Sequence, residues 1–108
     1  MKRYAALKLI FPSGKSLPHQ VVEVGQDGRP LCCYPLHEEQ HSTEWLPGVL
    51  LLSPMQLCTD DLKNWEGVLE KMNTSTCAKV EVFILYYINL FDMQRMKPMD
   101  GSILKQLL

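Results

Sequence analysis

The stretch that decides the fold is Trp45-Leu46-Pro47-Gly48-Val49-Leu50-Leu51-Leu52-Ser53-Pro54, in the middle of the chain. It holds a turn signal at Pro47-Gly48, then an uninterrupted apolar run, then a second break at Ser53-Pro54. A half-buried strand alternates apolar and polar residues, so an unbroken apolar run is typical of a strand buried on both faces. We therefore predict that Trp45–Leu52 is a strand, with a break at Pro47-Gly48, at the centre of the fold.

The segments on either side of this stretch differ in pattern. Upstream, short runs separated by turn signals predict three strands, at 4–11, 19–24 and 29–34. Downstream, Thr59 is a candidate helix cap, and an apolar stripe recurs at helical spacing, formed by Leu62, Trp65, Val68, Leu69 and Met72. Residues 80–90 are then rich in β-branched and aromatic side chains and predict the longest strand, and residues 101–108 a last strand. The sequence thus predicts one α+β domain over 1–108, a small, mostly antiparallel sheet or sandwich of about six strands with one amphipathic helix near residues 60–72.

Composition excludes several classes of function. Apolar residues make up 46% of the 108 residues and charged residues 21%, which is ordinary for a globular domain. The formal net charge is −1, and a nucleic-acid-binding surface needs clustered Lys and Arg, so we expect no nucleic-acid partner. The most hydrophobic segment, 80–91, contains Glu81 and is shorter than the roughly 20 residues that span a membrane. We find no signal peptide and expect no membrane partner and a cytoplasmic location.

The four cysteines are not arranged as a disulfide scaffold. Cys32 and Cys33 are adjacent, so on a strand their side chains point to opposite faces, and Cys58 and Cys77 lie singly elsewhere. We expect four reduced thiols that mostly pack as small hydrophobic side chains.

One segment matches a catalytic metal motif. His37-Glu38-Glu39-Gln40-His41 has the H-E-x-x-H spacing of zinc peptidases, in which two imidazoles one helical turn apart hold the metal and the Glu acts as base. That geometry needs a stable helix, whereas Pro35 lies just upstream and no apolar stripe supports the segment. The prediction is a solvated loop, with a zinc site at His37 and His41 as the alternative.

Two further groups of residues carry weaker signals. Met93, Met96 and Met99 have the spacing of a thioether cluster for a soft metal ion, but Pro98 interrupts it and core packing is the simpler reading. Cys58 lies near the start of the predicted helix, where a thiol can be activated, but no histidine partner is identifiable in the sequence. We therefore assign no catalytic residue, no metal ligand and no cofactor.

The order of these patterns resembles a known family. The turn after Phe11, the Val21-Val22-Glu23-Val24 run, Asp27-Gly28-Arg29-Pro30-Leu31 and Leu46-Pro47-Gly48-Val49-Leu50-Leu51 are similar to the N-terminal part of amidohydrolase-superfamily enzymes, which are metal-dependent hydrolases. The segments 84–93 and 103–107 resemble the strands that close the same small β (composite) domain in that family. The resemblance implies a composite-type β domain, and it covers most of the chain.

The chain also departs from that family. The His-x-His metal pair would fall near Cys58-Thr59-Asp60, where there is no histidine, and the TIM barrel of about 200 residues or more is missing. We therefore expect a non-catalytic, stand-alone relative of the composite domain that acts in protein association, as a homodimer or as a detached subunit. The alternatives are the metal site at His37 and His41, and a small-ligand-binding β module whose pocket lies between helix and sheet, lined by Trp45, Trp65 and Tyr86.

Overall fold

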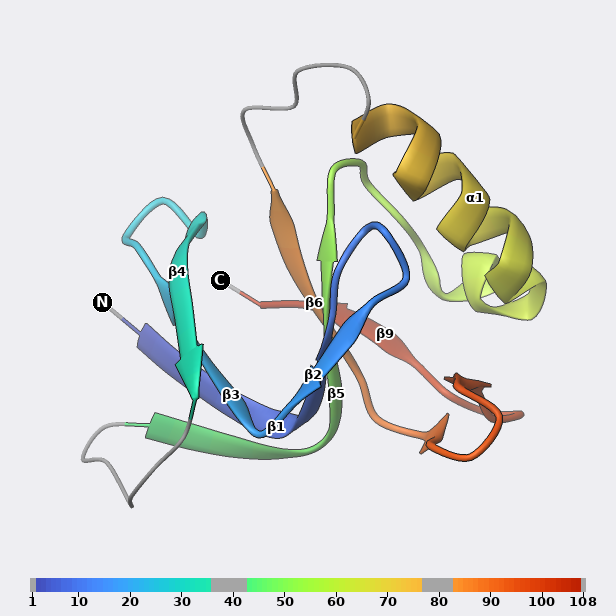
Figure 1. Ribbon diagram of the computed structural model, residues 1–108. Coiled ribbons are helices and arrows are strands. Elements are labelled where there is room, and N and C mark those ends of the chain that lie inside the picture. The colour runs from blue at the N-terminus through green and yellow to red at the C-terminus, as the bar shows by residue number, and fades with distance from the viewer. Residues whose placement is uncertain (1, 36–42, 77–82, 108) are drawn as a thin grey trace.

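The computed structural model describes residues 2–35, 43–76 and 83–107 and has the α+β architecture that the sequence predicts (Figure 1). One α-helix follows directly on a 3-10 helix, and the other elements of the described ranges are strands. In chain order the elements are β1 (Lys2–Ile10), β2 (Ser16–Pro18), β3 (Gln20–Val24), β4 (Pro30–Pro35), β5 (Thr43–Ser53), η1 (Thr59–Asn64), α1 (Trp65–Thr76), β6 (Ile84–Ile88), β7 (Phe91–Asp92), β8 (Lys97–Pro98) and β9 (Leu104–Gln106).

The strands form one large sheet and one small hairpin. The large sheet has seven strands in the order β4-β3-β1-β5-β6-β9, with β2 also paired to β1. The central pair, β1 and β5, is parallel, and the other pairs of this sheet are antiparallel. The two-residue strands β7 and β8 pair with each other. The prediction of a mostly antiparallel sheet is therefore confirmed.

The sheet bends in the middle of its two central strands (Figure 1). The β1–β5 register shifts between Ala6 and Lys8, opposite Pro47-Gly48. On one side of the bend, residues 2–5 of β1 pair with β3; on the other side, residues 8–10 pair with β2, and residues 49–53 of β5 pair with β6. We call these the N-terminal half (β4, β3 and the first parts of β1 and β5) and the C-terminal half (β2, β6, β9 and the second parts).

The predicted break at Pro47-Gly48 is wrong, because β5 runs through these two residues without interruption. With eleven residues in all, it is the longest of the described strands. The dipeptide instead forms the irregular point at which the sheet bends. Here the end of β6, the antiparallel neighbour of β5, lies so close to Gly48 that an added Cβ would collide with the backbone oxygen of Ile88 and come within 2.9 Å of the Tyr87 ring. The Tyr87 hydroxyl also donates a hydrogen bond to the Pro47 carbonyl at 2.7 Å. The turn signal thus marks a bend in a strand.

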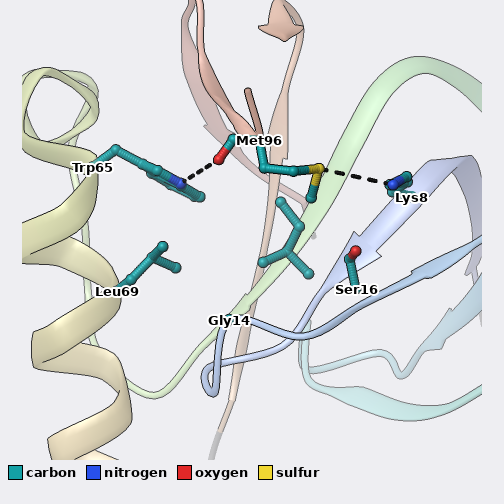
Figure 2. Close-up of a pocket in the computed structure, with 7 residues that line it drawn as sticks. Lys8, Gly14, Ser16, Trp65, Leu69 and Met96 are labelled. Atoms are coloured by element: carbon teal, nitrogen blue, oxygen red, sulfur yellow. Dashed lines mark hydrogen bonds between the residues drawn. The ribbon is translucent and has the colours of Figure 1, made fainter. Parts of the chain in front are cut away.

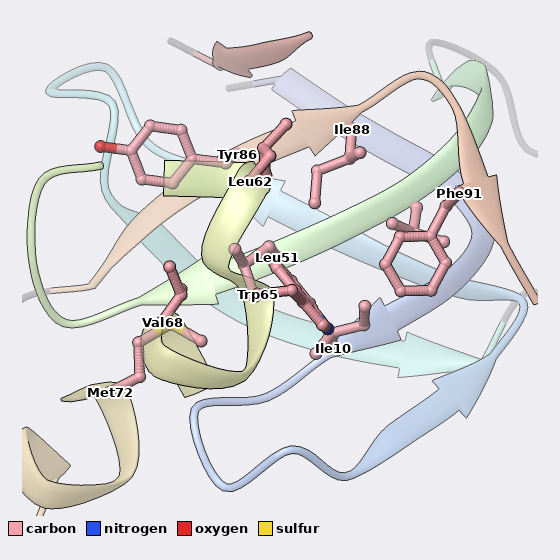
Figure 3. Packing of buried hydrophobic residues seen from close by; sticks show 10 residues of the cluster. Ile10, Leu51, Leu62, Trp65, Val68, Met72, Tyr86, Ile88 and Phe91 are labelled. Carbon is pink, nitrogen blue, oxygen red and sulfur yellow. The ribbon is translucent and has the colours of Figure 1, made fainter. Parts of the chain in front are cut away.

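Two hydrophobic clusters lie on the two faces of β5. Val49, Leu50 and Leu51 are all 0% exposed, as the unbroken apolar run predicts. Val49 and Leu51 belong to the first cluster, which α1 covers (Figure 3). Leu50 belongs to the second cluster, which joins Tyr4 and Val22 of the N-terminal half to residues of β6 and the C-terminus. Because the sheet bends, its two halves pack against each other on this face and bury the second cluster between them.

The helical segment begins differently from the prediction. The N-cap is Cys58, not Thr59, and the Asp61 carboxylate accepts the Cys58 backbone N–H at 2.7 Å. The Thr59 hydroxyl instead accepts the backbone N–H of Leu104 at 3.3 Å. The apolar stripe does face the sheet: Leu62, Trp65, Val68 and Met72 are buried and Leu69 packs against the same cluster.

Other boundaries differ modestly. Strand β2 was not predicted, and the segment 91–98 expected as a turn contains the β7–β8 hairpin. The last strand is only Leu104–Gln106. The predicted longest strand, 80–90, is wrong in its described part: residues 83, 89 and 90 are not in a strand, and β6 covers only Ile84–Ile88, fewer residues than β5. Residues 80–82 lie outside the described ranges. No helix in the described ranges is long and apolar enough to cross a membrane.

Candidate functional site

Of the candidate metal and nucleophile residues His37, His41 and Cys58, the structure describes Cys58. His37 and His41 lie outside the described residues. Across residues 2–35, 43–76 and 83–107, no group of three or more His, Cys, Asp or Glu side chains is arranged to hold a metal ion. Cys58 is exposed at the start of η1. The one histidine among these residues, His19, stacks on Trp45 in the other half of the sheet, so it cannot serve as a base for Cys58.

The three methionines occupy different environments. Met93 and Met96 are partly buried and pack against the first cluster, as the core-packing interpretation predicts. Met99 is 47% exposed. The Met96 sulfur accepts a weak hydrogen bond from the Lys8 ammonium at 3.8 Å.

The first candidate site is a sheet face that α1 leaves uncovered. Helix α1 packs on one face of the C-terminal half, and the corresponding face of the N-terminal half has no helix over it in the described structure (Figure 1). Residues that face each other on neighbouring strands form two rows of side chains across this face. One row is Tyr34, Val21, Ala5 and Trp45, and the other is Cys32, Glu23 and Arg3. We call this surface the open face; it carries Arg3, Ala5, Val21, Glu23, Cys32, Tyr34 and Trp45.

The first of these rows has two small side chains in its middle and a large aromatic side chain at each end. Ala5 and Val21 are 0% exposed although they belong to neither hydrophobic cluster, and the larger Tyr34 and Trp45 flank them on the same face. Trp45 itself is 46% exposed. The imidazole of His19 stacks on it, with ring centroids 6.4 Å apart and planes inclined by 21°.

Glu23 is the polar centre of the open face. Its carboxylate accepts hydrogen bonds from Arg3 Nε at 2.9 Å, from the Tyr34 hydroxyl at 3.1 Å and from the Cys32 thiol at 3.3 Å. Arg3 and Glu23 face each other on adjacent strands, and Cys32 lies opposite Glu23 on the next strand. The hydrogen bonds from Arg3, Cys32 and Tyr34 lower the pKa of Glu23, so this carboxylate is ionised at neutral pH.

The prediction that the cysteines pack as small hydrophobic side chains is wrong for the three described. Cys32, Cys33 and Cys58 are free and exposed, and Cys77 lies outside the described residues. Cys32 and Cys33 are exposed because β4 is an edge strand with little packed on it. Local burial of its sulfur and the hydrogen bond to Glu23 raise the pKa of Cys32. A smaller fraction of this thiol is therefore in the nucleophilic thiolate form than in a free cysteine.

The second candidate site is a pocket between α1 and the β1–β2 hairpin (Figure 2). Its volume is about 270 Å³, and it is lined by Lys8, Ile10, Gly14, Ser16, Trp65, Leu69 and Met96. Figure 2 shows Trp65 and Leu69 on the helix side and Lys8 and Ser16 on the hairpin side, with Met96 between them. The Trp65 indole N–H donates to the Met96 carbonyl at 3.1 Å, which fixes one wall.

The ligand pocket expected from the sequence is therefore only partly in place. Trp65 lines the pocket between helix and sheet, as predicted. Tyr86 is instead buried in the first cluster, where its hydroxyl accepts the backbone N–H of Leu57 at 2.9 Å. Trp45 lies on the open face. Lys8 and Ser16 were missed because no local pattern separates a pocket lysine from a solvated one.

No protein-family model, curated protein or solved structure matches this chain.

Proposed function

We propose that the protein is a non-catalytic association module that forms a homodimer through the open face. The observation that carries the proposal is Trp45, which is 46% exposed on the sheet surface that α1 leaves uncovered. Exposed aromatic side chains beside an arginine are typical of the residues that dominate binding energy at protein interfaces. On this face Tyr34 lies in the same row as Trp45, and Arg3 lies in the neighbouring row.

A second copy of the chain is the partner that the charges of the open face favour. Arg3 and Glu23 are its two charged residues among those described, so the surface has no net charge and does not repel an identical copy. A two-fold axis between them would place Arg3 of one protomer opposite Glu23 of the other, as an isologous interface requires.

Pairing through the sheet edge is the less favourable route to a dimer. Strand β4 forms that edge and has no charged residue, but it begins at Pro30 and ends at Pro35. Proline has no backbone N–H, so both ends of the edge lack a donor for an added strand. The proposal therefore uses the face and not the edge.

The resemblance to the composite domain of amidohydrolase-superfamily enzymes is compatible with a homodimer. A composite-type domain without its barrel would have a sheet surface to cover, and a homodimer covers it. That resemblance rests on the sequence pattern, and the dimer proposal stands without it. We further propose that the protein works in the cytoplasm, where exposed thiols such as Cys32 and Cys33 stay reduced.

Sedimentation velocity over a range of micromolar concentrations tests the proposal. We expect the wild-type chain to sediment as a dimer and the Trp45→Lys variant as a monomer. Ile103→Lys is the matched control, since Ile103 is also a large apolar residue, 56% exposed, but belongs to the segment before β9. Its sedimentation should equal that of the wild type.

Two results would overturn the proposal. One is a wild-type monomer throughout the concentration range, which would leave the open face to a different protein. The other is a dimer that dissociates in Ile103→Lys and persists in Trp45→Lys, which would place the interface near β9. Circular dichroism of both variants checks that each is folded.

A further inference from the structure

The pocket beside α1 combines an apolar wall with a single cationic group. Trp65, Leu69 and Ile10 belong to the first hydrophobic cluster or pack against it, and they form the apolar side. Lys8 and Ser16 lie at the opposite side (Figure 2). Small-molecule sites usually have this composition, with an apolar lining and a few polar groups that orient the ligand.

Lys8 is directed to this position by the sheet. It pairs with Val49 in the β1–β5 register, two residues before Ile10, and both lie on the face that α1 covers. Ser16 lies directly opposite Ile10 on β2. A lysine on this face is half-buried instead of fully solvated, and its stem packs along apolar surface while the ammonium remains at the pocket.

The ammonium of Lys8 has little to bind inside the protein. An ammonium group has three N–H donors. Its one hydrogen bond within the described structure goes to the Met96 sulfur at 3.8 Å, and a thioether is a weak acceptor. Among the described residues no carboxylate lies within 4.0 Å of it. A positive charge beside an apolar pocket, without an anionic partner there, is suited to a negatively charged ligand.

We propose that this pocket binds a small organic carboxylate, with its hydrocarbon part against Trp65 and Leu69 and its carboxylate on the ammonium of Lys8. A cavity of about 150 Å³ already admits benzene. The volume of about 270 Å³ found here therefore suits an acid of short aliphatic or single-ring size. The Ser16 hydroxyl, on the same side as Lys8, supplies a second donor for the carboxylate. The proposal is independent of the homodimer, because the open face and the pocket lie on different halves of the sheet.

Hexanoate and hexanamide are suitable probes because they have the same number of heavy atoms and differ mainly in charge. Each is titrated into the ¹⁵N-labelled full chain while the indole N–H resonance of Trp65 is followed by NMR. That resonance reports on the pocket, because the same N–H donates to Met96. We expect hexanoate to shift it at millimolar concentration and to bind at least about tenfold more tightly than hexanamide, as a charge-assisted hydrogen bond requires.

Three variants locate the site. Lys8→Met keeps the length of the side chain and removes the charge, so the preference for hexanoate over hexanamide should disappear. Lys15→Met, in the exposed turn of the same hairpin and outside the pocket lining, should keep it. Leu69→Trp fills the apolar side and should abolish binding of both probes.

The wild-type titration alone can overturn the proposal. Equal affinities for the two probes would remove the role of the charge, and the absence of any Trp65 shift at millimolar hexanoate would remove the site. A preference for hexanoate that survives in Lys8→Met would show that the acid binds elsewhere.

Discussion

The indole N–H of Trp65 donates a hydrogen bond to the backbone oxygen of Met96 at 3.1 Å, across 31 positions of sequence. Trp65 is the first residue of α1 and is 7% exposed, and its ring also meets Phe91 edge-on with centroids 5.7 Å apart. Met96 lies in the β7–β8 turn with a positive φ of 54°. The pair ties the helix to that turn and closes one wall of the pocket.

Replacing Trp65 by phenylalanine should therefore destabilise the fold. The variant loses the hydrogen bond, leaves the Met96 carbonyl without that donor and removes part of a buried ring, at a combined cost of about 2 kcal/mol. Urea denaturation measures it. Met96→Leu is the control because it retains the backbone acceptor, and its loss should stay below about 1 kcal/mol. Equal losses in the two variants would contradict a role for the hydrogen bond.

Gly48→Ala should be more harmful than a typical glycine substitution. Its Cβ would collide with the backbone of β6, so β5 and β6 would have to move apart, at a cost of about 3 kcal/mol. Gly14→Ala is the comparison: Gly14 has a φ of 88° but open space around the added Cβ, so it should lose only about 1 kcal/mol of backbone strain. Chemical denaturation ranks the two, and a larger loss in Gly14→Ala would refute the close contact.

Glu23 should make stability depend on pH in the acid range. Its pKa is lower in the folded chain than the value of about 4.3 expected in the unfolded chain. A lowered folded pKa stabilises the protein above the unfolded pKa, and that contribution is lost as the pH falls through the folded pKa. The free energy of unfolding should thus fall less steeply below about pH 5 in Glu23→Gln than in the wild type. Superimposable pH profiles would show that Glu23 has no such effect.

The thiol of Cys32 should react faster once Glu23 is neutral. The Glu23 carboxylate accepts its hydrogen bond and helps to raise its pKa, which lowers the thiolate fraction. In Glu23→Gln, iodoacetamide should therefore modify Cys32 faster at pH 8, as followed by peptide mass spectrometry. Cys58, the N-cap of η1 beside the other half of the sheet, serves as the internal control and should react at an unchanged rate. An unaltered Cys32 rate would mean that the carboxylate does not control this thiol.

Local patterns predicted the central elements of this fold. The run Val49–Leu52 required a strand buried on both faces, and its residues divide between two clusters. The stripe from Leu62 to Met72 predicted the helix face that packs on the sheet. Strand ends and caps were less predictable, because Cys58 and Asp61 provide the cap that Thr59 was expected to form.

The candidate sites could not be read from the sequence in the same way. Arg3, Glu23 and Cys32 are neighbours only because three strands align them across the sheet. Lys8 reaches a pocket with Trp65 only after the helix packs on the sheet. Contacts between such distant positions leave no periodic signal in a single sequence.

The sequence by itself determined the α+β class, the buried central strand and the amphipathic helix, because apolar periodicity and turn residues act locally. Tertiary structure decided that Pro47-Gly48 bends a continuous strand instead of ending it, since β1 pairs with β5 on both sides of this point and the end of β6 packs against Gly48. It also decided which side chains remain available for binding. The bend divides the sheet into two halves and α1 covers only one, which exposes Trp45 and places Lys8 beside Trp65.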